Sequence, residues 1–110
     1  MRIVTIVGAR PQFIKAAAVS RAISQVESIN EIIIHTGQHF DNDMYNVFFE
    51  ELKMPLPKYE LNVNGGGHGS MTGRMLIKLE DVLITEKPDL VLLYGDTNST
   101  LAGALVASKL

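Results

Sequence analysis

Three short apolar runs constrain the fold of this chain most, because each one leads directly into a polar turn that contains glycine. The runs cover residues 3–7, 32–34 and 90–94 and consist mainly of isoleucine, valine and leucine. A strand that is covered on both faces is apolar throughout, whereas a half-exposed strand alternates between apolar and polar residues. The three runs therefore predict three buried strands.

Amphipathic helical patterns separate these runs. Residues 11–26 start at Pro11, a favourable first residue of a helix, and place four apolar side chains on one face. That apolar face consists of Ala16, Val19, Ile23 and Val26, and the opposite face of Ser20, Arg21, Ser24 and Gln25. Residues 44–52 predict a second helix, which Pro55 and Pro57 stop. Residues 59–63 are ambiguous and could form a short extended piece.

The clearest helical pattern precedes the third run. Its apolar face consists of Met75, Leu76, Leu79, Val82 and Leu83, and its polar face of Arg74, Lys78 and Asp81. Residues 87–89 end this helix, and a last helix begins at about Asn98 and is apolar nearly all round. The glycine-rich residues 64–69 predict a mobile loop, which is either a flexible connector or a lid.

The alternation of strands and helices predicts an α/β fold, namely a Rossmann-like parallel sheet with flanking helices. Three strands make only half of a doubly wound fold. We therefore expect residues 1–110 to be an N-terminal Rossmann-like domain that is truncated, with a second domain absent. The alternatives are a chain that needs a partner and a small three-stranded domain.

The composition excludes several classes of function. A net charge of −2 argues against a nucleic-acid-binding surface, and 0 cysteines exclude a disulfide framework and a thiol nucleophile. No stretch approaches the ~20 apolar residues that a membrane span needs. The 3 histidines lack the spacing of metal ligands, so we expect no metal site. Of these, His35 is expected to be structural and His68 solvated. The composition is consistent with a cytoplasmic protein.

Ligands of open parallel sheets bind beyond the carboxyl ends of the strands, where three polar turns lie in this sequence. In the first, Gly8 permits a sharp turn, and Arg10 and Lys15 lie at the positive end of the following helix. Cations are unfavourable at that end of a helix dipole, whereas a bound phosphate would be favourable. We therefore interpret Gly8, Arg10 and Lys15 as a phosphate site. The alternative is that both cationic side chains extend into solvent.

The other two turns carry candidate groups for catalysis and binding. Asp96 could act as a general acid or base, although Asp96 or Thr97 could equally cap the last helix. His39 could donate a hydrogen bond to a phosphate or move a proton, or it could be an ordinary loop residue. Neither Gly-x-Gly-x-x-Gly nor Gly-x-x-x-x-Gly-Lys is present, which argues against a dinucleotide site and a Walker-type NTPase.

These motifs together resemble the non-hydrolysing UDP-N-acetylglucosamine 2-epimerases. The resemblance rests on Gly-Ala-Arg-Pro-Gln-Phe-Ile-Lys at residues 8–15, Thr-Gly-Gln-His at 36–39 and Gly-Asp-Thr-Asn-Ser-Thr at 95–100. It implies a glycosyltransferase-B-like protein of two Rossmann-like domains, with the substrate between them. The family inverts C2 of a UDP-amino sugar by eliminating UDP to a glycal and adding it back, and needs no cofactor or metal.

The resemblance also implies roles for individual residues. Arg10 and Lys15 serve the diphosphate side of the cleft, Asp96 belongs to the catalytic group, and Gly8, His39 and Thr97 contact the substrate. Some family members carry a regulatory site for a second UDP-N-acetylglucosamine. In this sequence, its positions correspond to Gln38, His39 and Arg74.

The first two motifs look more like the branch that acts on UDP-2,3-diacetamido-uronic acids, so two substrates remain open. A glycosyltransferase of similar fold and a non-catalytic nucleotide-sugar-binding module are the alternatives from other classes. We expect a cytoplasmic isomerase of cell-surface polysaccharide biosynthesis that binds a UDP-sugar, forms a homodimer, and contacts neither nucleic acid nor membrane.

Overall fold

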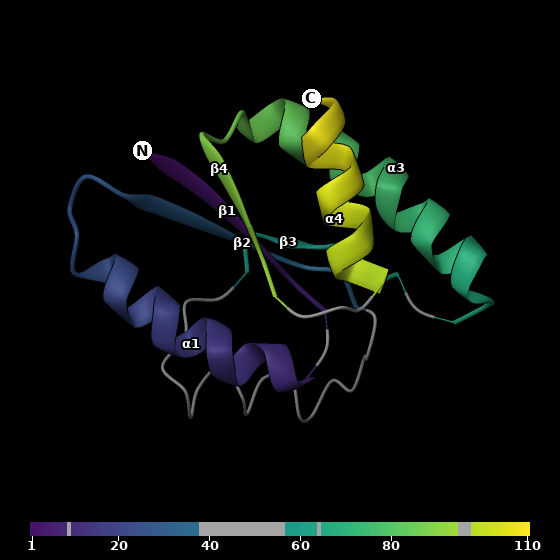
Figure 1. The fold of residues 1–110 in the computed structure, drawn as a ribbon, viewed down its shortest axis with the longest axis horizontal. Helices are drawn as coiled ribbons and strands as arrows, with labels where there is room; N and C mark the ends of the chain where they lie inside the picture. The colour runs from purple at the N-terminus through teal and green to yellow at the C-terminus, as the bar shows by residue number, and fades with distance from the viewer. Residues whose placement is uncertain (9, 38–56, 64, 95–97) are drawn as a thin grey trace.

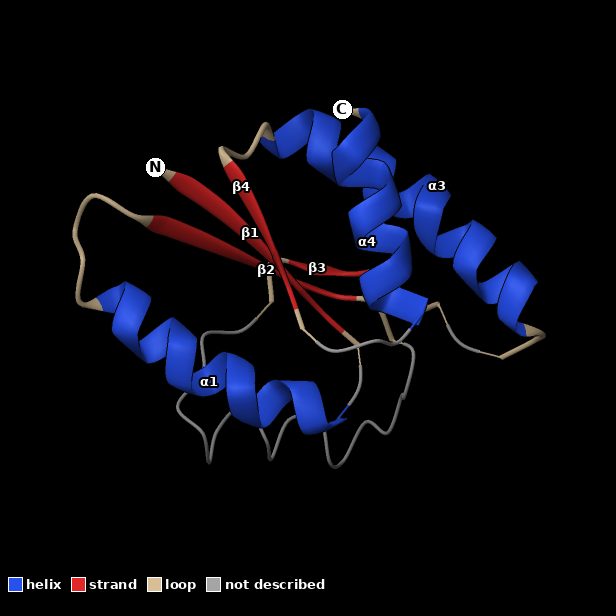
Figure 2. Ribbon diagram, viewed as in Figure 1, coloured by secondary structure: helices blue, strands red, loops and turns tan. Residues whose placement is uncertain are grey.

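A computed structural model describes residues 1–8, 10–37, 57–63, 65–94 and 98–110 of the chain. Its strands form one parallel sheet in the order β3-β2-β1-β4, as Figure 1 shows. The strands are β1 (Arg2–Val7), β2 (Asn30–His35), β3 (Tyr59–Glu60) and β4 (Leu90–Leu93). Helix α1 (Arg10–Ser24) covers one face, and α3 (His68–Glu86) and α4 (Asn98–Lys109) cover the other (Figure 2). The predicted Rossmann-like parallel sheet is confirmed.

The apolar runs of β1 and β2 are buried on both faces, as predicted. Successive side chains of a strand point to opposite faces, so each strand contributes to two cores. Under α3 and α4, the core includes Val4, Ile6, Ile32, Ile34, Met75 and Leu79. Under α1, a smaller core consists of Val7, Ala16, Ala17 and Ile33.

Helix α3 has the predicted faces, with Met75, Leu79, Val82 and Leu83 buried and Leu76 half-buried. It ends where predicted, because Lys87 takes a left-handed conformation and donates its N–H to the carbonyl of Leu83. The predicted glycine loop is shorter than expected, since His68 and Gly69 already belong to the helix. Gly65 and Gly66 form the remaining turn, both with a φ of 77°.

The predicted apolar face of α1 is only partly right. Ala16 is buried and Ile23 is half-buried, as predicted, but Val19 and Val26 are 38% and 42% exposed. The helix ends at Ser24, and between Lys15 and Ser24 its buried residues are Ala16, Ala17 and Ser20. The pattern of large apolar residues missed Ala17 and Ser20 because small side chains fill the space between α1 and the sheet. Among the residues described, no helix is both long and apolar enough to cross a bilayer.

The sheet differs from the prediction in two ways. The ambiguous residues 59–63 supply a fourth strand, because Tyr59 and Glu60 pair with β2. β4 is an edge strand and not a buried one, since it pairs only with β1 among the described residues and Leu90 is 50% exposed. The predicted helix at residues 44–52 lies outside the described residues.

Candidate functional site

The direction in which successive strands are added to the sheet reverses at β1. From β1 the chain adds β2 and β3 on one side and then returns to add β4 on the other. Ligands of doubly wound folds bind at the carboxyl ends of the strands at such a reversal. Gly8 follows β1 there, and α1 begins two residues later at Arg10. Helix α4 begins at Asn98, after β4. Two helix amino-termini, whose first backbone N–H groups have no carbonyl partner within their own helix, therefore follow β1 and β4.

Gly8 allows α4 to approach the end of β1 closely. Gly8 is buried, and a Cβ atom at this position would overlap the hydroxyl of Ser99 and lie 2.5 Å from Oγ1 of Thr36. Because atoms do not approach that closely without displacement, any larger residue would push α4 away from the sheet. Glycine was predicted after β1 because it permits a sharp turn, and the structure shows that it also permits close packing.

Two buried hydroxyl groups join the end of β2 to the start of α4. Thr36 Oγ1 and Ser99 Oγ lie 2.7 Å apart in a buried hydrogen bond, and Ser99 Oγ also lies 3.7 Å from the sulfur of Met75 in α3. Thr100 Oγ1 donates to the carbonyl of Tyr94, 2.5 Å away, which ties α4 to the end of β4. These contacts fix the amino-terminus of α4 against the ends of β2 and β4 and against α3. Sequence reasoning placed Thr36 and Ser99 in motifs but missed that they form a pair.

His35, at the carboxyl end of β2, is 2% exposed and structural, as predicted. Burial lowers the pKa of its imidazole from 6.5 to about 4, and the nearby carboxylate of Glu60 opposes this shift only in part. The side chain is therefore neutral at pH 7 and contributes no positive charge to this edge of the sheet.

The structure places part of the predicted site. Gly8 lies at the reversal, Arg10 is the first residue of α1, and Lys15 lies further along the same helix with an exposed side chain. Arg74 Nη2 donates to the carbonyl of Gly65 at 2.5 Å, so its guanidinium holds the glycine turn before α3. Gln38, His39, Asp96 and Thr97 lie outside the described residues. The functional roles of all these residues stay predictions.

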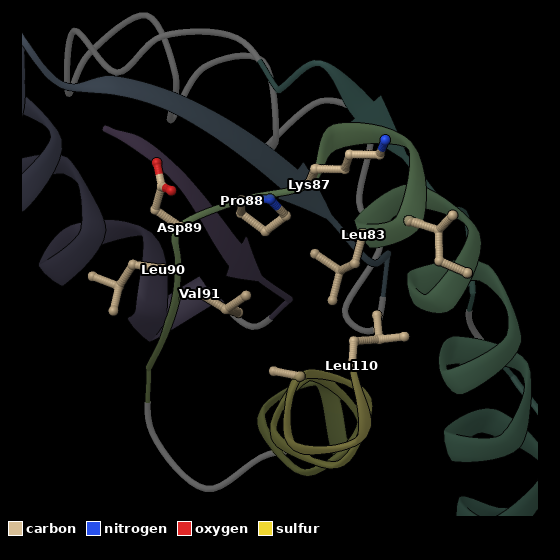
Figure 3. A pocket seen from close by; sticks show the side chains of 9 residues that line it. Leu83, Lys87, Pro88, Asp89, Leu90, Val91 and Leu110 are labelled. Carbon is tan, nitrogen blue, oxygen red and sulfur yellow. The ribbon is translucent and has the colours of Figure 1, made fainter.

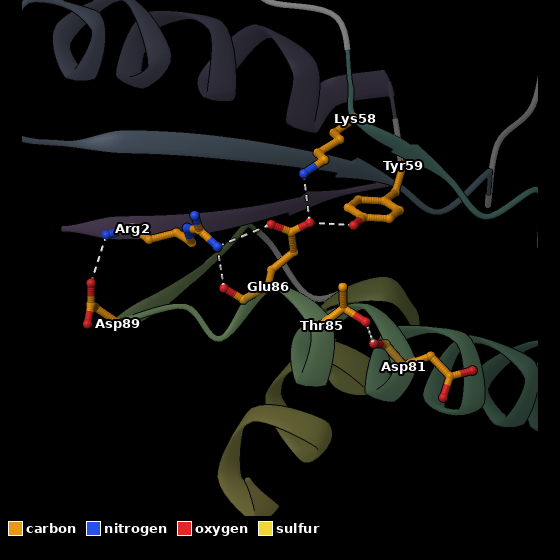
Figure 4. Close-up of polar contacts among 7 residues, drawn as sticks. All are labelled: Arg2, Lys58, Tyr59, Asp81, Thr85, Glu86 and Asp89. Atoms are coloured by element: carbon orange, nitrogen blue, oxygen red, sulfur yellow. Dashed lines mark hydrogen bonds and ion pairs between the residues drawn. The ribbon is translucent and has the colours of Figure 1, made fainter.

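A charged network surrounds Glu86 at the end of α3, as Figure 4 shows. The carboxylate of Glu86, at the end of α3, accepts a hydrogen bond from the hydroxyl of Tyr59 and one from Lys58 Nζ at 2.9 Å. Arg2 Nη1 lies 3.4 Å from the same carboxylate and donates to the backbone carbonyl of Glu86 at 2.7 Å. The hydrogen bonds from Tyr59 and Lys58 lower the pKa of Glu86. This network joins β1, β3 and α3, so we interpret it as structural.

A pocket of about 500 Å³ lies between the end of α3, the start of β4 and the end of α4 (Figure 3). Pro88, Asp89 and Leu90 line it at the amino end of β4, and Leu110 lines it after α4. It is therefore separate from the edge that carries Gly8. The described residues include no group of three or more histidine, aspartate or glutamate side chains that could hold a metal ion.

Comparisons with known proteins extend these observations. A family model described as UDP-N-acetylglucosamine 2-epimerase matches residues 21–110. UDP-2,3-diacetamido-2,3-dideoxy-D-glucuronate 2-epimerase of Pseudomonas aeruginosa is 64% identical over 100% of this chain, which corresponds to 31% of that protein. A UDP-N-acetylglucosamine 2-epimerase homolog of Methanococcus maripaludis is 63% identical over 100% of this chain and 30% of its own length. The chain thus spans about a third of the length of these relatives.

Solved structures give the same result. The crystal structure of Methanocaldococcus jannaschii UDP-GlcNAc 2-epimerase in complex with UDP-GlcNAc and UDP matches 99% of this chain with a TM-score of 0.94 and 52% identity, and the match covers 30% of that chain. The Neisseria meningitidis UDP-GlcNAc 2-epimerase bound to UDP-GlcNAc matches 97% with a TM-score of 0.88 and 31% identity, covering 29% of that chain.

Proposed function

Because this chain belongs to the UDP-N-acetylglucosamine 2-epimerase family, we propose that it is the N-terminal, substrate-binding domain of a UDP-sugar 2-epimerase. The complete enzyme inverts C2 of a UDP-amino sugar. It eliminates UDP across C1 and C2 to give a glycal and then adds UDP back with the proton on the other face of C2. The matches to about 30% of each relative support the assignment of this chain to one domain of such an enzyme.

The observation that carries this proposal is the position of two helix amino-termini at the reversal of the sheet. Helices α1 and α4 begin beyond the carboxyl ends of β1 and β4, and Gly8 lets α4 pack close to β1. Free N–H groups and aligned peptide dipoles make such positions favourable for a diphosphate. Arg10 and Lys15 add positive charge along α1, where an arginine can form two parallel hydrogen bonds to a phosphate.

The remaining roles follow the motifs of the family. Asp96, which lies between β4 and α4 in the sequence, is our proposed catalytic acid or base, and Thr97 and His39 are proposed substrate contacts. Gln38, His39 and Arg74 are the proposed residues of a regulatory site for a second nucleotide sugar.

Two substrates are supported to a similar extent. The diacetamido-glucuronate epimerase is 64% identical to this chain, and the UDP-N-acetylglucosamine 2-epimerase homolog is 63% identical. Identity therefore does not separate the two sugars, and both belong in the activity assay. The two sugars differ at C3 and C5, so their UDP groups can bind in the same way while different residues contact the sugar ring.

The decisive test of this function is incorporation of solvent deuterium at C2. The intact enzyme is incubated in D₂O with each UDP-sugar, and NMR follows loss of the C2 proton signal together with formation of the C2 epimer. Elimination and re-addition place deuterium at C2 of the product. Inversion without exchange would contradict the mechanism, and absence of any inversion with either sugar would contradict the proposed function.

A binding experiment tests the proposed diphosphate site independently. Calorimetric titration with UDP compares Arg10→Ala with the matched control Arg21→Ala, which removes the same charge at the far end of α1. We expect the affinity to fall by about tenfold or more in Arg10→Ala, corresponding to ~1.4 kcal/mol, and to change little in the control. An equal effect of both substitutions would mean that only the overall charge matters.

We further propose that the enzyme is a cytoplasmic homodimer. The exposed apolar side chains on its helices support self-association, and the absence of cysteine in these 110 residues is consistent with a reducing compartment. Sedimentation of the purified protein and fractionation of the cells that produce it test these two points.

A further inference from the structure

Tyr94 follows β4 and is anchored by its side chain on the face of the sheet that α1 covers. It packs against the small core under α1, which consists of Val7, Ala16, Ala17 and Ile33. The hydroxyl oxygen of Tyr94 is buried, and this burial, together with the nearby carboxylate of Glu31, raises the pKa of the hydroxyl. The side chain is therefore held between the sheet and α1, although Tyr94 follows an edge strand.

The residue before Tyr94 is anchored on the opposite face of the sheet. Leu93 packs against the core under α3 and α4. Helix α4 approaches it closely at Gly103, where a Cβ atom would lie 2.5 Å from Cδ2 of Leu93 and 3.0 Å from Cδ1 of Ile6. Because successive side chains of a strand point to opposite faces, Leu93 and Tyr94 fix the end of β4 between the two layers of helices (Figure 1).

The main chain of Tyr94 is fixed as well. Its carbonyl oxygen accepts the hydrogen bond from Thr100 Oγ1 at 2.5 Å, and Thr100 lies in the first turn of α4. Residues 95–97 lie between Tyr94 and Thr100 in the sequence and include Asp96, the proposed catalytic acid or base. Fixing the two ends of a short segment restricts the conformations that the segment can take.

We propose that Tyr94 is a positioning residue of the epimerase reaction, which holds Asp96 in place relative to α1 and acts through Asp96 and not by contact with the substrate. The side chain of Tyr94 packs under α1, the helix that carries Arg10 and Lys15, while its carbonyl binds α4. A displacement of about 1 Å at a reacting group can slow a reaction ~100-fold, so such a link affects the rate. This inference rests on the proposed function, because it concerns the same site.

Steady-state kinetics of the intact enzyme test this role, with Tyr59 as the matched control. Tyr59 is also a half-buried tyrosine, and its hydroxyl binds Glu86 in the network at the end of α3. We expect Tyr94→Leu to lower kcat about tenfold or more and to change the dissociation constant of UDP little. Tyr94→Phe keeps the packing under α1 and should recover most of kcat. Tyr59→Leu should lower the melting temperature and leave kcat nearly unchanged.

The hydrogen bond from Thr100 gives a second test. Thr100→Val removes the hydroxyl, keeps the shape of the side chain and should lower kcat, whereas Thr100→Ser keeps the hydroxyl and should retain most of the activity. The control is Thr85→Val, since Thr85 Oγ1 also donates to a backbone carbonyl, that of Asp81, at 2.9 Å. Because Tyr94 and Thr100 act on the same segment, Tyr94→Leu and Thr100→Val together should lower kcat by less than the product of their separate effects.

Hydrogen exchange gives a readout that does not depend on activity. Tyr94→Leu should speed amide exchange in both α1 and α4 more than Tyr59→Leu does, because only Tyr94 joins the two helices. Exchange in Tyr94→Leu that matches the control would contradict this link and overturn the proposal.

Two kinetic outcomes would also overturn it. Equal losses of kcat in Tyr94→Leu and Tyr59→Leu would mean that Tyr94 only stabilises the fold. An unchanged kcat with weaker binding of UDP would mean that Tyr94 supports binding and not the chemical step. Absence of epimerase activity in the wild type would contradict the proposed function instead, so the two failures can be told apart.

Discussion

Replacing Gly8 by alanine tests the close approach on which the candidate site depends. The new methyl group would overlap the hydroxyl of Ser99 and lie 2.5 Å from Oγ1 of Thr36, and both hydroxyl groups are buried. Overpacking of this kind costs about 1–3 kcal/mol. If the hydrogen bond between Thr36 and Ser99 also breaks, a further ~1 kcal/mol is lost. We therefore expect Gly8→Ala to lower the free energy of unfolding by about 2–4 kcal/mol.

Urea unfolding followed by circular dichroism measures this loss, and Gly73→Ala is the matched control. A Cβ atom at Gly73 meets no other atom within 4 Å, and the residue lies inside α3. Alanine is a better helix former than glycine, so this control is expected to gain about 0.5–1 kcal/mol. The same substitution is thus expected to lower the free energy of unfolding at Gly8 and to raise it at Gly73.

A double-mutant cycle identifies the group that the methyl group meets. Ser99→Ala removes the hydroxyl that overlaps it, so Gly8→Ala should cost about 1 kcal/mol less in the Ser99→Ala background. The rescue is partial because Thr36 Oγ1 remains at 2.5 Å. Wild-type stability in Gly8→Ala, or strictly additive effects of the two substitutions, would refute the close approach of α4 to β1.

Three further predictions concern the core and the titrating groups. Leu79→Ala, at a position with 0% exposure, is expected to cost about 2–5 kcal/mol in urea unfolding, whereas Leu101→Ala on the surface costs much less. NMR titration should find the His35 pKa near 4, lowered from 6.5. Because the folded protein favours the neutral imidazole, this group's contribution to the free energy of unfolding is fully present above pH 6.5 and is lost as the pH falls toward 4. The pKa of Glu86 is lowered from its ordinary value of 4.5, so its carboxylate stabilises the fold above pH 4.5 and this contribution is lost as the pH falls below that. Glu86→Gln should therefore make the free energy of unfolding less dependent on pH in this acidic range. An unchanged pH dependence in that variant would contradict the network.

Local patterns predicted the elements whose burial is set by their own sequence. The run in β1 and the faces of α3 were predictable, because large apolar residues at the period of the element identify its buried side. The face of α1 was predictable only in part, since the buried Ala17 and Ser20 are small and carry little apolar signal. The position of β4 at the edge depends on which strands lie beside it, and the two residues of β3 form a strand only by pairing with β2. Both depend on partners distant in sequence.

The candidate site shows the same division between local and distant information. The turn at Gly8 was predicted, and the helix predicted from Pro11 begins one residue earlier at Arg10, because a glycine and a proline that follow an apolar run mark a turn and a helix start. The hydrogen bond between Thr36 and Ser99 was not predictable, because it joins residues 63 positions apart. It holds the amino-terminus of α4 against the end of β2.

The residues that meet at the carboxyl ends of the strands carry no charge that could attract a phosphate. Gly8, Thr36 and Ser99, which meet there, are all uncharged, and the hydroxyl groups of Thr36 and Ser99 are hydrogen-bonded to each other. Under the proposed function, attraction for a diphosphate comes from the backbone N–H groups at the starts of α1 and α4 and from Arg10 and Lys15. These groups recognise phosphate oxygens but not a uracil or a sugar ring. Under the proposed function, this chain alone should bind UDP and inorganic diphosphate with similar affinity, and preference for UDP should appear only in the intact enzyme.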